Sequence, residues 1–257
     1  MATYSLKKSY QLKNLKEINF QDLWGDHGIF TTMWIFGKPA KILFFKNHLS
    51  NLIKSLKKYG IRKKTLKKDI LKIINSNLAI KYNYNHLLRI ALNKKIISIS
   101  LRRRNSPKKN FSLKLVNLKR EKPEFKNLKY KKILSYLSKM DNSKSDIGLV
   151  VNKKILETGT SNLLFIKDQK VFAPKKNYYE GNTFKFFKTK IRKIIKKDIL
   201  LKEIKNYDEI LLIGSGKGVT SVKTINELKW KRKNLKKFKF LSKQYDVVIN
   251  KCNSYSF

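Results

Sequence analysis

The chain has 257 residues, and its 61 Lys and Arg residues against 17 Asp and Glu residues give a formal net charge of +44 at pH 7. Hydrophobic residues make up 41% and aromatic residues 12%, which excludes a disordered basic tail and leaves material for a folded core. The sequence contains no apolar run of the roughly 18 residues that a membrane span needs and no export signal after Met1, so we expect a cytoplasmic protein. It has a single cysteine, Cys252, and no Cys/His cluster for zinc, so we expect neither a disulfide nor a metal.

The first half of the chain predicts both strands and helices. A short apolar run at residues 42–45 indicates a strand, and the apolar residues between 49 and 56 follow the i, i+3, i+4, i+7 spacing of an amphipathic helix. A second helix is predicted around residues 66–74. Three β-prone runs follow at residues 88–92, 96–101 and 111–116, with the turn-like sequence Asn105-Ser106-Pro107 before the last.

The second half again mixes the two kinds of element. It restarts with a predicted helix over residues 128–139, and helical spacing of Phe and Ile predicts another over 183–197. Short strands are expected at residues 147–151, 163–166, 171–173 and 209–213. Because both halves contain helices and strands, the sequence predicts the α+β class with two domains, residues 1–121 and 122–257.

The charge alone would favour a nucleic-acid partner, because Lys and Arg neutralise phosphates. Only eight of the basic residues are Arg, however, and the lysines are spread along the whole chain. Arginine is the residue favoured for bidentate phosphate and base contacts, and Lys, Asn and Ile share A/T-rich codons. Drift in base composition therefore explains the excess better, and a nucleic-acid partner is not expected. A basic RNA-binding protein remains the alternative from a different class.

Two places could hold a phosphate group. The glycine-rich sequence Gly214-Ser215-Gly216-Lys217-Gly218 follows a predicted strand, although it is not a G-x-x-x-x-G-K-[ST] loop. The sequence Tyr179-Glu180-Gly181-Asn182-Thr183 opens a predicted helix, whose N-terminus would attract an anion. A plain turn and a plain helix cap are the alternative interpretations. Two such places suggest one phosphorylated cofactor held from both sides.

Six short motifs occur in order along the chain. They are Gly25-Asp26-His27-Gly28-Ile29-Phe30-Thr31-Thr32, His48-Leu49-Ser50-Asn51-Leu52, Lys132-Ile133-Leu134-Ser135, Glu157-Thr158-Gly159-Thr160-Ser161-Asn162-Leu163, Gly181-Asn182-Thr183, and Gly214-Ser215-Gly216 followed by Val219-Thr220. Their order resembles that of the class IV (fold type IV) pyridoxal-phosphate enzymes, which include branched-chain and D-amino-acid aminotransferases and aminodeoxychorismate lyase. The resemblance implies a two-domain, D-amino-acid aminotransferase-like fold, in which an α/β-barrel-like C-terminal domain carries the Schiff-base lysine.

The resemblance also implies roles for individual residues. Lys132 would be the Schiff-base lysine and proton shuttle, with Lys129 and Lys131 as alternatives if the register slips. Glu157 would face the pyridine nitrogen of the cofactor and keep it protonated. The implied cofactor-binding residues are Lys132, Glu157, Asn182, Thr183, Val219 and Thr220, of which the last four would bind the phosphate.

Two departures from the family pattern leave a degraded or inactive homologue as an alternative. Asn51 stands where an Arg commonly pairs with the cofactor phosphate, and an amide supplies no charge, so phosphate binding should be weaker. Lys54, about one helical turn further on, could compensate in part. The interval from Lys132 to Glu157 is also several residues shorter than is usual in the family.

Within the family, the sequence looks most like aminodeoxychorismate lyase. Thr31 and Thr32 follow Phe30, where branched-chain enzymes commonly carry an acidic residue, and the chain is compact. The resemblance then implies release of pyruvate from 4-amino-4-deoxychorismate, leaving 4-aminobenzoate for folate synthesis. Arg89 or the arginines at 102–104 could orient this dicarboxylate. A branched-chain or D-amino-acid aminotransferase is the alternative, and a homodimer is expected because family members are commonly dimers.

Overall fold

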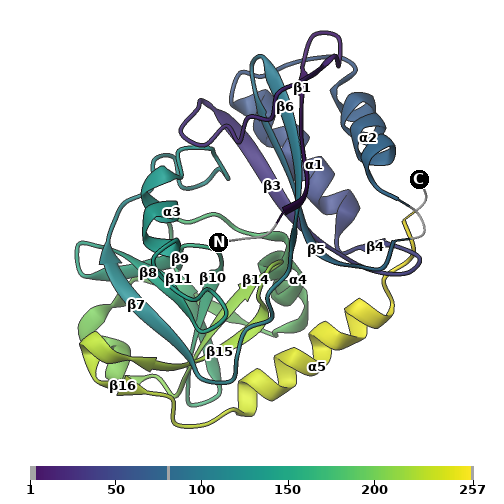
Figure 1. Cartoon of the computed structure of the whole chain (residues 1–257). Helices are drawn as coiled ribbons and strands as arrows, with labels where there is room; N and C mark the ends of the chain where they lie inside the picture. Colours follow the sequence, from purple (N-terminus) through teal and green to yellow (C-terminus); the bar gives the residue numbers. More distant parts are fainter. Residues whose placement is uncertain (1–3, 80–81, 256–257) are drawn as a thin grey trace. The chain divides into compact units, whose positions relative to one another are not determined.

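The computed structural model describes residues 4–79 and 82–255, and the chain divides by its contacts into two compact units (Figure 1). Unit 1 comprises Met1–Arg104, Phe125–Lys131 and Cys252–Phe257, and unit 2 comprises Asn105–Glu124 and Lys132–Lys251. Helices and strands occur in both, which confirms the predicted α+β class. The domain ranges 1–121 and 122–257 stay a prediction.

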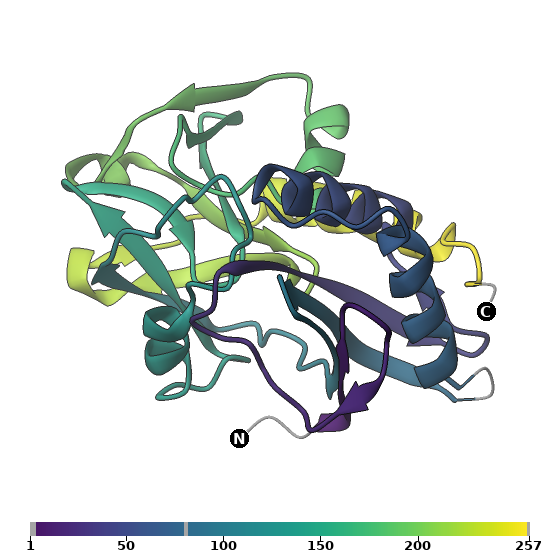
Figure 2. The same ribbon diagram turned by 90° about the horizontal axis from the view of Figure 1, so that it is seen from above.

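Unit 1 contains a six-stranded antiparallel sheet in the order β2-β1-β6-β5-β3-β4. Its strands are β1 (Tyr4–Gln11), β2 (Glu17–Ile18), β3 (Gly28–Gly37), β4 (Lys41–Ile42), β5 (Tyr84–Asn93) and β6 (Ile96–Arg103). Helices α1 (Phe45–Lys58) and α2 (Leu66–Asn77) lie on one side of this sheet (Figure 2). Apolar side chains of both helices and of β3, β5 and β6 form one buried core.

The amphipathic helix predicted around residues 49–56 is confirmed as α1. Leu49, Leu52 and Leu56 are buried against the sheet, where alternate residues of β3 also point. The strand predicted over 42–45 is wrong beyond Ile42. Phe44 has a left-handed backbone with φ of 56°, which breaks the extended chain and lets α1 begin at the next residue.

Unit 2 contains a ten-stranded sheet in the order β12-β11-β10-β14-β15-β7-β8-β9-β13, with β16 paired to β15. The strands are β7 (Phe111–Asn117), β8 (Ser145–Val151), β9 (Lys154–Thr158), β10 (Asn162–Lys167), β11 (Lys170–Pro174), β12 (Ile194–Lys197), β13 (Ile199–Leu200), β14 (Glu209–Gly214), β15 (Gly218–Ile225) and β16 (Trp230–Lys231). The helices in this part of the chain are α3 (Lys131–Leu137), α4 (Asn182–Lys190), α5 (Lys236–Asn250) and two short 3-10 helices, Leu201–Asn206 and Asn226–Leu228. Phe111, Phe165 and Val222 are fully buried in its core.

The helix predicted over residues 183–197 is wrong at its C-terminal end. Helix α4 stops at Lys190, and Ile194–Lys197 forms β12, which runs parallel to β11. Ile at positions 194 and 195 fits helical spacing, but β-branched residues also favour strands, and β11 offers backbone partners that the local sequence does not reveal.

The helix predicted over residues 128–139 is shorter, because the chain before it is extended. The amide of Phe30 donates to the carbonyl oxygen of Lys126 at 2.9 Å, and the amide of Leu128 donates to the carbonyl oxygen of Gly28 at 2.9 Å. These bonds pair the segment Phe125–Lys131 with the start of β3 inside unit 1. Helix α3 therefore begins at Lys131.

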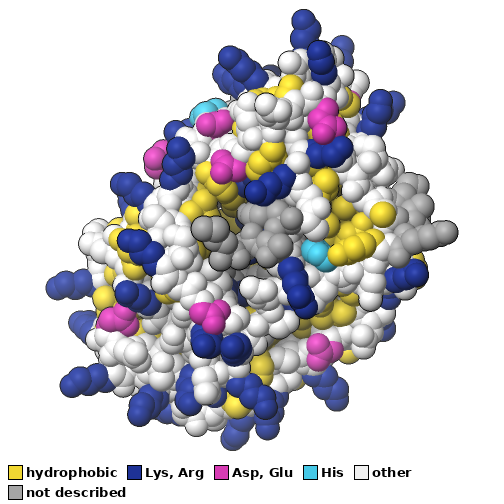
Figure 3. Space-filling model, viewed as in Figure 1, with side chains coloured by type: hydrophobic (Ala, Val, Ile, Leu, Met, Phe, Trp, Pro, Cys, Tyr) yellow, Lys and Arg dark blue, Asp and Glu magenta, His cyan; other side chains and the backbone are white. Residues whose placement is uncertain are grey.

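The basic side chains are distributed widely over the surface that Figure 3 shows. Lys and Arg side chains are scattered over the face shown in Figure 3 rather than gathered in one patch. Within residues 4–79 and 82–255, no helix is long and apolar enough to cross a membrane. The same residues contain no group of three or more His, Cys, Asp or Glu side chains that could hold a metal ion.

Candidate functional site

Glu157 is a buried carboxylate near the end of β9 in unit 2, with 4% of its surface exposed. Its oxygens face the guanidinium of Arg120, with the Nε–Oε1 and Nη1–Oε2 distances both 3.4 Å. The backbone amide of Tyr179 also donates to Oε2, at 3.3 Å. Because the guanidinium keeps its charge, this arrangement supports an ionised carboxylate in a buried position.

Asn162, at the start of β10, holds the loop that leads into α4. Its side-chain Nδ2 donates to the carbonyl oxygen of Tyr179 at 2.6 Å, and its Oδ1 accepts the amide hydrogen of Gly181 at 3.0 Å. The motif that begins at Glu157 thus fixes the Tyr179–Gly181 loop at two points, through the Glu157 carboxylate and the Asn162 amide. The structure therefore brings Glu157, Asn182 and Thr183 into one part of unit 2.

Thr183 provides an unsatisfied polar group at the N-terminus of α4. The residue is 1% exposed, and its Oγ1 is buried with no hydrogen-bond partner among the described residues. Gly181, at the N-cap, supplies no side-chain cap, and Asn182 is 6% exposed. A buried hydroxyl without a partner is costly, and a helix N-terminus carries partial positive charge. Both features fit an anionic ligand such as a phosphate group.

The second glycine loop is the turn of the hairpin formed by β14 and β15, in which Gly214 pairs with Gly218. Gly214 packs closely on the motif that begins at Glu157, since a Cβ there would lie 2.7 Å from the Oγ of Ser161. The hydroxyl of Thr220 donates to the carbonyl oxygen of Lys217 at 2.9 Å, inside the hairpin. Phosphate binding by Val219 and Thr220 stays a prediction.

The lysines that the sequence singles out lie on the surface. Lys132 is exposed on α3, and Lys129 and Lys131 are exposed as well. The Lys131 side chain passes close to Gly25, where a Cβ would lie 2.6 Å from its Cε. The role given to Lys132 stays a prediction, but its position shows nothing that distinguishes it from other surface lysines.

Sequence reasoning missed Lys126, which is half-buried in unit 1. Its Nζ lies 5.1 Å from the centre of the Phe30 ring, and its charge helps to lower the pKa of His48. Lys126 thus lies beside residues of the first two motifs. The length of the interval before Glu157 could have identified Lys126. Counted from Lys126, this interval is six residues longer than when it is counted from Lys132, so it is no longer shorter than is usual in the family.

Thr31 and His48 form a buried, neutral pair next to Lys126. The Thr31 Oγ1 and the His48 Nδ1 are 2.7 Å apart, and the two residues are 5% and 4% exposed. Burial, and secondarily the Lys126 charge, lowers the pKa of His48 from 6.5 to about 3. The imidazole is therefore uncharged at neutral pH.

This lowered pKa predicts acid sensitivity. The unfolded chain takes up a proton on His48 below about pH 6.5 while the folded chain does not, so the stabilising contribution is complete above that pH and is lost as pH falls toward 3. Between about pH 7.5 and about pH 5, we expect the wild type to lose about 2 kcal/mol relative to His48→Gln. Urea unfolding of both proteins at both pH values measures this difference, and equal losses would show that His48 titrates normally.

The arginines considered for substrate binding make structural contacts. The Nη2 of Arg89 donates to the carbonyl oxygen of Asp22 at 2.9 Å, and the guanidinium stacks over Trp24 at 4.2 Å. Arg104 stacks over Trp34 at 4.1 Å. Both side chains therefore stabilise unit 1, and a role in orienting substrate stays a hypothesis.

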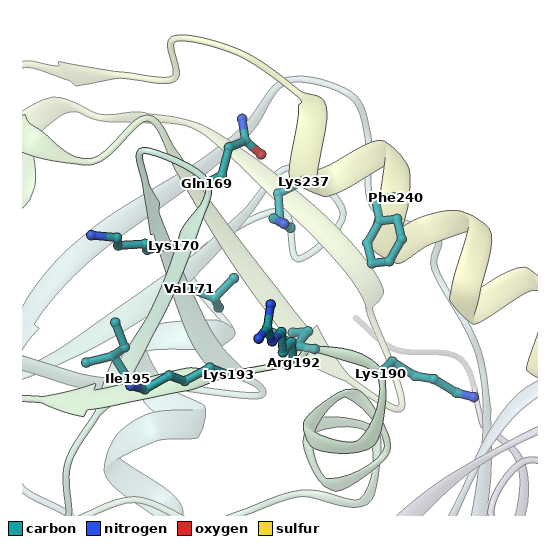
Figure 4. Close-up of a pocket in the computed structure, with 10 residues that line it drawn as sticks. Gln169, Lys170, Val171, Lys190, Arg192, Lys193, Ile195, Lys237 and Phe240 are labelled. Carbon is teal, nitrogen blue, oxygen red and sulfur yellow. The ribbon is translucent and has the colours of Figure 1, made fainter.

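A separate groove lies in unit 2 between β11, the chain after α4, and α5 (Figure 4). It is lined by Gln169, Lys170, Val171, Lys190, Ile191, Arg192, Lys193, Ile195, Lys237 and Phe240. Five of these ten residues are Lys or Arg, as expected where lysine is so abundant. The groove contains none of the residues that the sequence singles out for chemistry.

Comparison with known proteins gives one family and many similar structures. A family model described as amino-transferase class IV matches residues 28–225. A branched-chain aminotransferase from Thermoproteus uzoniensis is 13% identical, with 95% of each chain covered and a TM-score of 0.77. A protein named as a candidate 4-amino-4-deoxychorismate lyase from Legionella pneumophila is 18% identical, with 85% of this chain and 91% of that chain covered and a TM-score of 0.66.

A hypothetical aminotransferase from Mycobacterium tuberculosis, in its PLP-bound form, is 12% identical, with 95% of this chain and 99% of that chain covered and a TM-score of 0.68. The comparison with curated proteins finds no match to the sequence. At these identities the solved structures show a shared fold, and the family model carries the assignment.

Proposed function

Because this chain belongs to the class IV aminotransferase family, whose enzymes use pyridoxal phosphate, we propose that it is an aminodeoxychorismate lyase. It would release pyruvate from 4-amino-4-deoxychorismate and leave 4-aminobenzoate, a precursor of folate. A branched-chain or D-amino-acid aminotransferase is the second candidate, since one fold supports both reactions. Branched-chain aminotransferases are among the similar structures.

The choice of the lyase over a branched-chain aminotransferase rests on the neutral pair of Thr31 and His48. Thr31 follows Phe30, at the place where branched-chain enzymes commonly have an acidic residue. A carboxylate within hydrogen-bond distance of His48 would favour the charged imidazole, whereas here burial lowers the pKa of His48 to about 3. The local charge therefore differs from the branched-chain pattern and supports the lyase.

We further propose that Lys126, rather than Lys132, binds the cofactor covalently. A lysine that attacks a carbonyl carbon and later transfers protons must be held in a fixed position. Lys126 is half-buried over Phe30, whereas Lys132 is exposed. The backbone bonds of Lys126 and Leu128 to β3 also fix this segment, which a positioned base requires.

Unit 2, taken by itself, offers residues for the ring nitrogen and the phosphate of pyridoxal phosphate. Glu157 would hold a proton at the pyridine nitrogen, and Asn182, Thr183 and the N-terminus of α4 would bind the phosphate. Val219 and Thr220 are proposed to add contacts to the phosphate. When bound, pyridoxal phosphate supplies an electron-withdrawing ring that weakens bonds in the attached substrate. The Lys126 amine would move protons during the reaction.

Thr183 offers a test of phosphate binding that does not depend on activity. Thr183→Val removes a buried hydroxyl without a partner, so the cofactor-free protein should be as stable as the wild type or slightly more stable. Affinity for pyridoxal phosphate should fall about fivefold to tenfold, the loss expected for one hydrogen bond. Urea unfolding and a binding titration measure the two effects, with Thr183→Ser as the matched control. Unchanged affinity in the Val variant would exclude this contact.

The function is tested by supplying the purified protein, loaded with pyridoxal phosphate, with 4-amino-4-deoxychorismate. We expect equal amounts of 4-aminobenzoate and pyruvate. Pairs of branched-chain or D-amino acids with 2-oxo acids should give little transfer. Efficient transfer without pyruvate release would instead identify an aminotransferase, and failure of the protein to bind pyridoxal phosphate would exclude both.

We also propose that the enzyme is a homodimer. Family members are commonly dimers, and the half-buried rings of Trp34 and Phe36 lie 4.5 Å apart on β3. Such an aromatic pair is the kind of surface that a second copy would cover. Light scattering during size-exclusion chromatography measures the mass in solution.

A further inference from the structure

Arg120 makes a deeply buried ion pair with Glu157. The Arg120 and Glu157 side chains are 7% and 6% exposed, whereas those of the Lys63–Asp69 pair are 25% and 13% exposed. Arg120 follows β7 in unit 2, and it is one of only eight arginines in the chain. In a protein with 53 lysines, an arginine is thus the cation placed against the one carboxylate that would face the cofactor.

The geometry fixes the guanidinium in one orientation. Nη2 of Arg120 donates to the carbonyl oxygen of Pro123 at 2.8 Å, while Nε and Nη1 face the two oxygens of Glu157. A two-pronged contact orients the plane of the carboxylate, which the single ammonium of a lysine would not do. The amide of Tyr179 adds a third contact to the same carboxylate.

The positive charge of Arg120 would affect where a proton resides when Glu157 faces a bound cofactor. A buried carboxylate prefers its neutral form, and a nearby cation favours the ionised form. When a carboxylate and a pyridine nitrogen share one proton, a cation closer to the carboxylate makes the carboxylate the weaker base of the two. The proton then resides on the nitrogen.

We propose that Arg120 is a positioning residue that keeps Glu157 ionised, so that the shared proton stays on the pyridine nitrogen of pyridoxal phosphate. This inference rests on the proposed role of Glu157 toward the cofactor. A purely structural purpose explains the pair less well, because buried ion pairs are often no more stabilising than apolar residues of similar size. A protonated ring nitrogen, by contrast, is what gives the ring its electron-withdrawing power.

The test is the nitrogen-15 NMR shift of labelled pyridoxal phosphate bound to the full-length protein at neutral pH. In the wild type we expect the shift of a protonated ring nitrogen. Arg120→Met should move the nitrogen-15 shift most of the way to the unprotonated value. Arg120→Lys should move it less, because lysine keeps the positive charge but lacks the two-pronged contact with the carboxylate. Arg232→Met, which removes a half-buried arginine elsewhere in unit 2, should leave the shift unchanged.

A double variant separates positioning from stability. Arg120→Met alone leaves a buried charge without its arginine and should lower the urea midpoint, whereas Arg120→Met with Glu157→Gln should recover that midpoint. The double variant should nevertheless keep an unprotonated nitrogen. If Arg120→Met or the double variant retains the wild-type shift, the inference is wrong.

The outcome also distinguishes this inference from the proposed function. If wild-type protein binds no pyridoxal phosphate, the proposed function fails. If it binds and Glu157→Gln changes the shift while Arg120→Met does not, Glu157 has its role and Arg120 does not position it. If neither variant changes the shift, the role of Glu157 is itself wrong.

Discussion

Replacing Lys126 with Ala is expected to abolish the covalent attachment of pyridoxal phosphate and to lower turnover by about a thousandfold or more. The side chain would supply both the nucleophile for the cofactor and the base that moves protons during the reaction, and the loss of a general base alone costs about 10²–10⁴-fold. Borohydride reduction of the loaded protein, followed by peptide mass spectrometry, locates the modified lysine directly. Visible absorption of the bound cofactor should disappear in the variant.

Lys132→Ala is the matched control, because it removes a lysine only six residues away that is exposed on α3. It should keep the visible absorption and most of the turnover. A reduced adduct on Lys132, Lys131 or Lys129, with Lys126 unmodified, would overturn the assignment to Lys126.

Gly28→Ala should cause a larger loss of stability than Ala at the other glycines of unit 1. A Cβ at Gly28 would lie 2.1 Å from the carbonyl oxygen of Leu92 and 2.7 Å from Cδ1 of Leu128. The first contact is with backbone, which cannot rotate away, so β3 and β5 must separate. We expect a loss of about 3 kcal/mol in the free energy of unfolding, at the upper end for overpacking.

Gly60→Ala serves as the control for this substitution. Gly60 has a φ of +80°, but a Cβ there would meet no atom within 4 Å. Its loss should be about 1 kcal/mol, from backbone conformation alone. Urea unfolding of the two variants separates steric overlap from backbone strain, and similar losses would show that β3 relaxes around Gly28.

Local sequence patterns predicted the elements whose burial pattern is visible in their own residues. Leu49, Leu52 and Leu56 mark α1 because one apolar face is enough to specify a helix that packs on a sheet. Helix α5 was missed, since only Leu241 and Tyr245 are buried along its fifteen residues. Strand β12 was mistaken for helix because its partner, β11, lies about twenty residues earlier in the sequence, and local spacing carries no record of it.

The same distinction applies to the candidate site. Glu157 and Asn162 lie within one short motif, and the structure places both against the loop before α4. Lys126 depends instead on pairing with β3, about a hundred residues away, and it lies outside the six motifs quoted from the sequence. The partner of Glu157, Arg120, matches none of the quoted motifs, and only the folded chain reveals it.

The extended segment Phe125–Lys131 has a consequence for anyone dividing this gene. A fragment that ends at residue 121 would lose the backbone partner of Gly28 and Phe30 at the start of β3. It would also lose Tyr255, whose amide donates to the carbonyl oxygen of Ala40 at 2.7 Å. An N-terminal half made this way lacks two stretches of its own unit, both of which the C-terminal half carries. The two halves are therefore better suited to being expressed together from two plasmids, where each can complement the other, than to being purified separately.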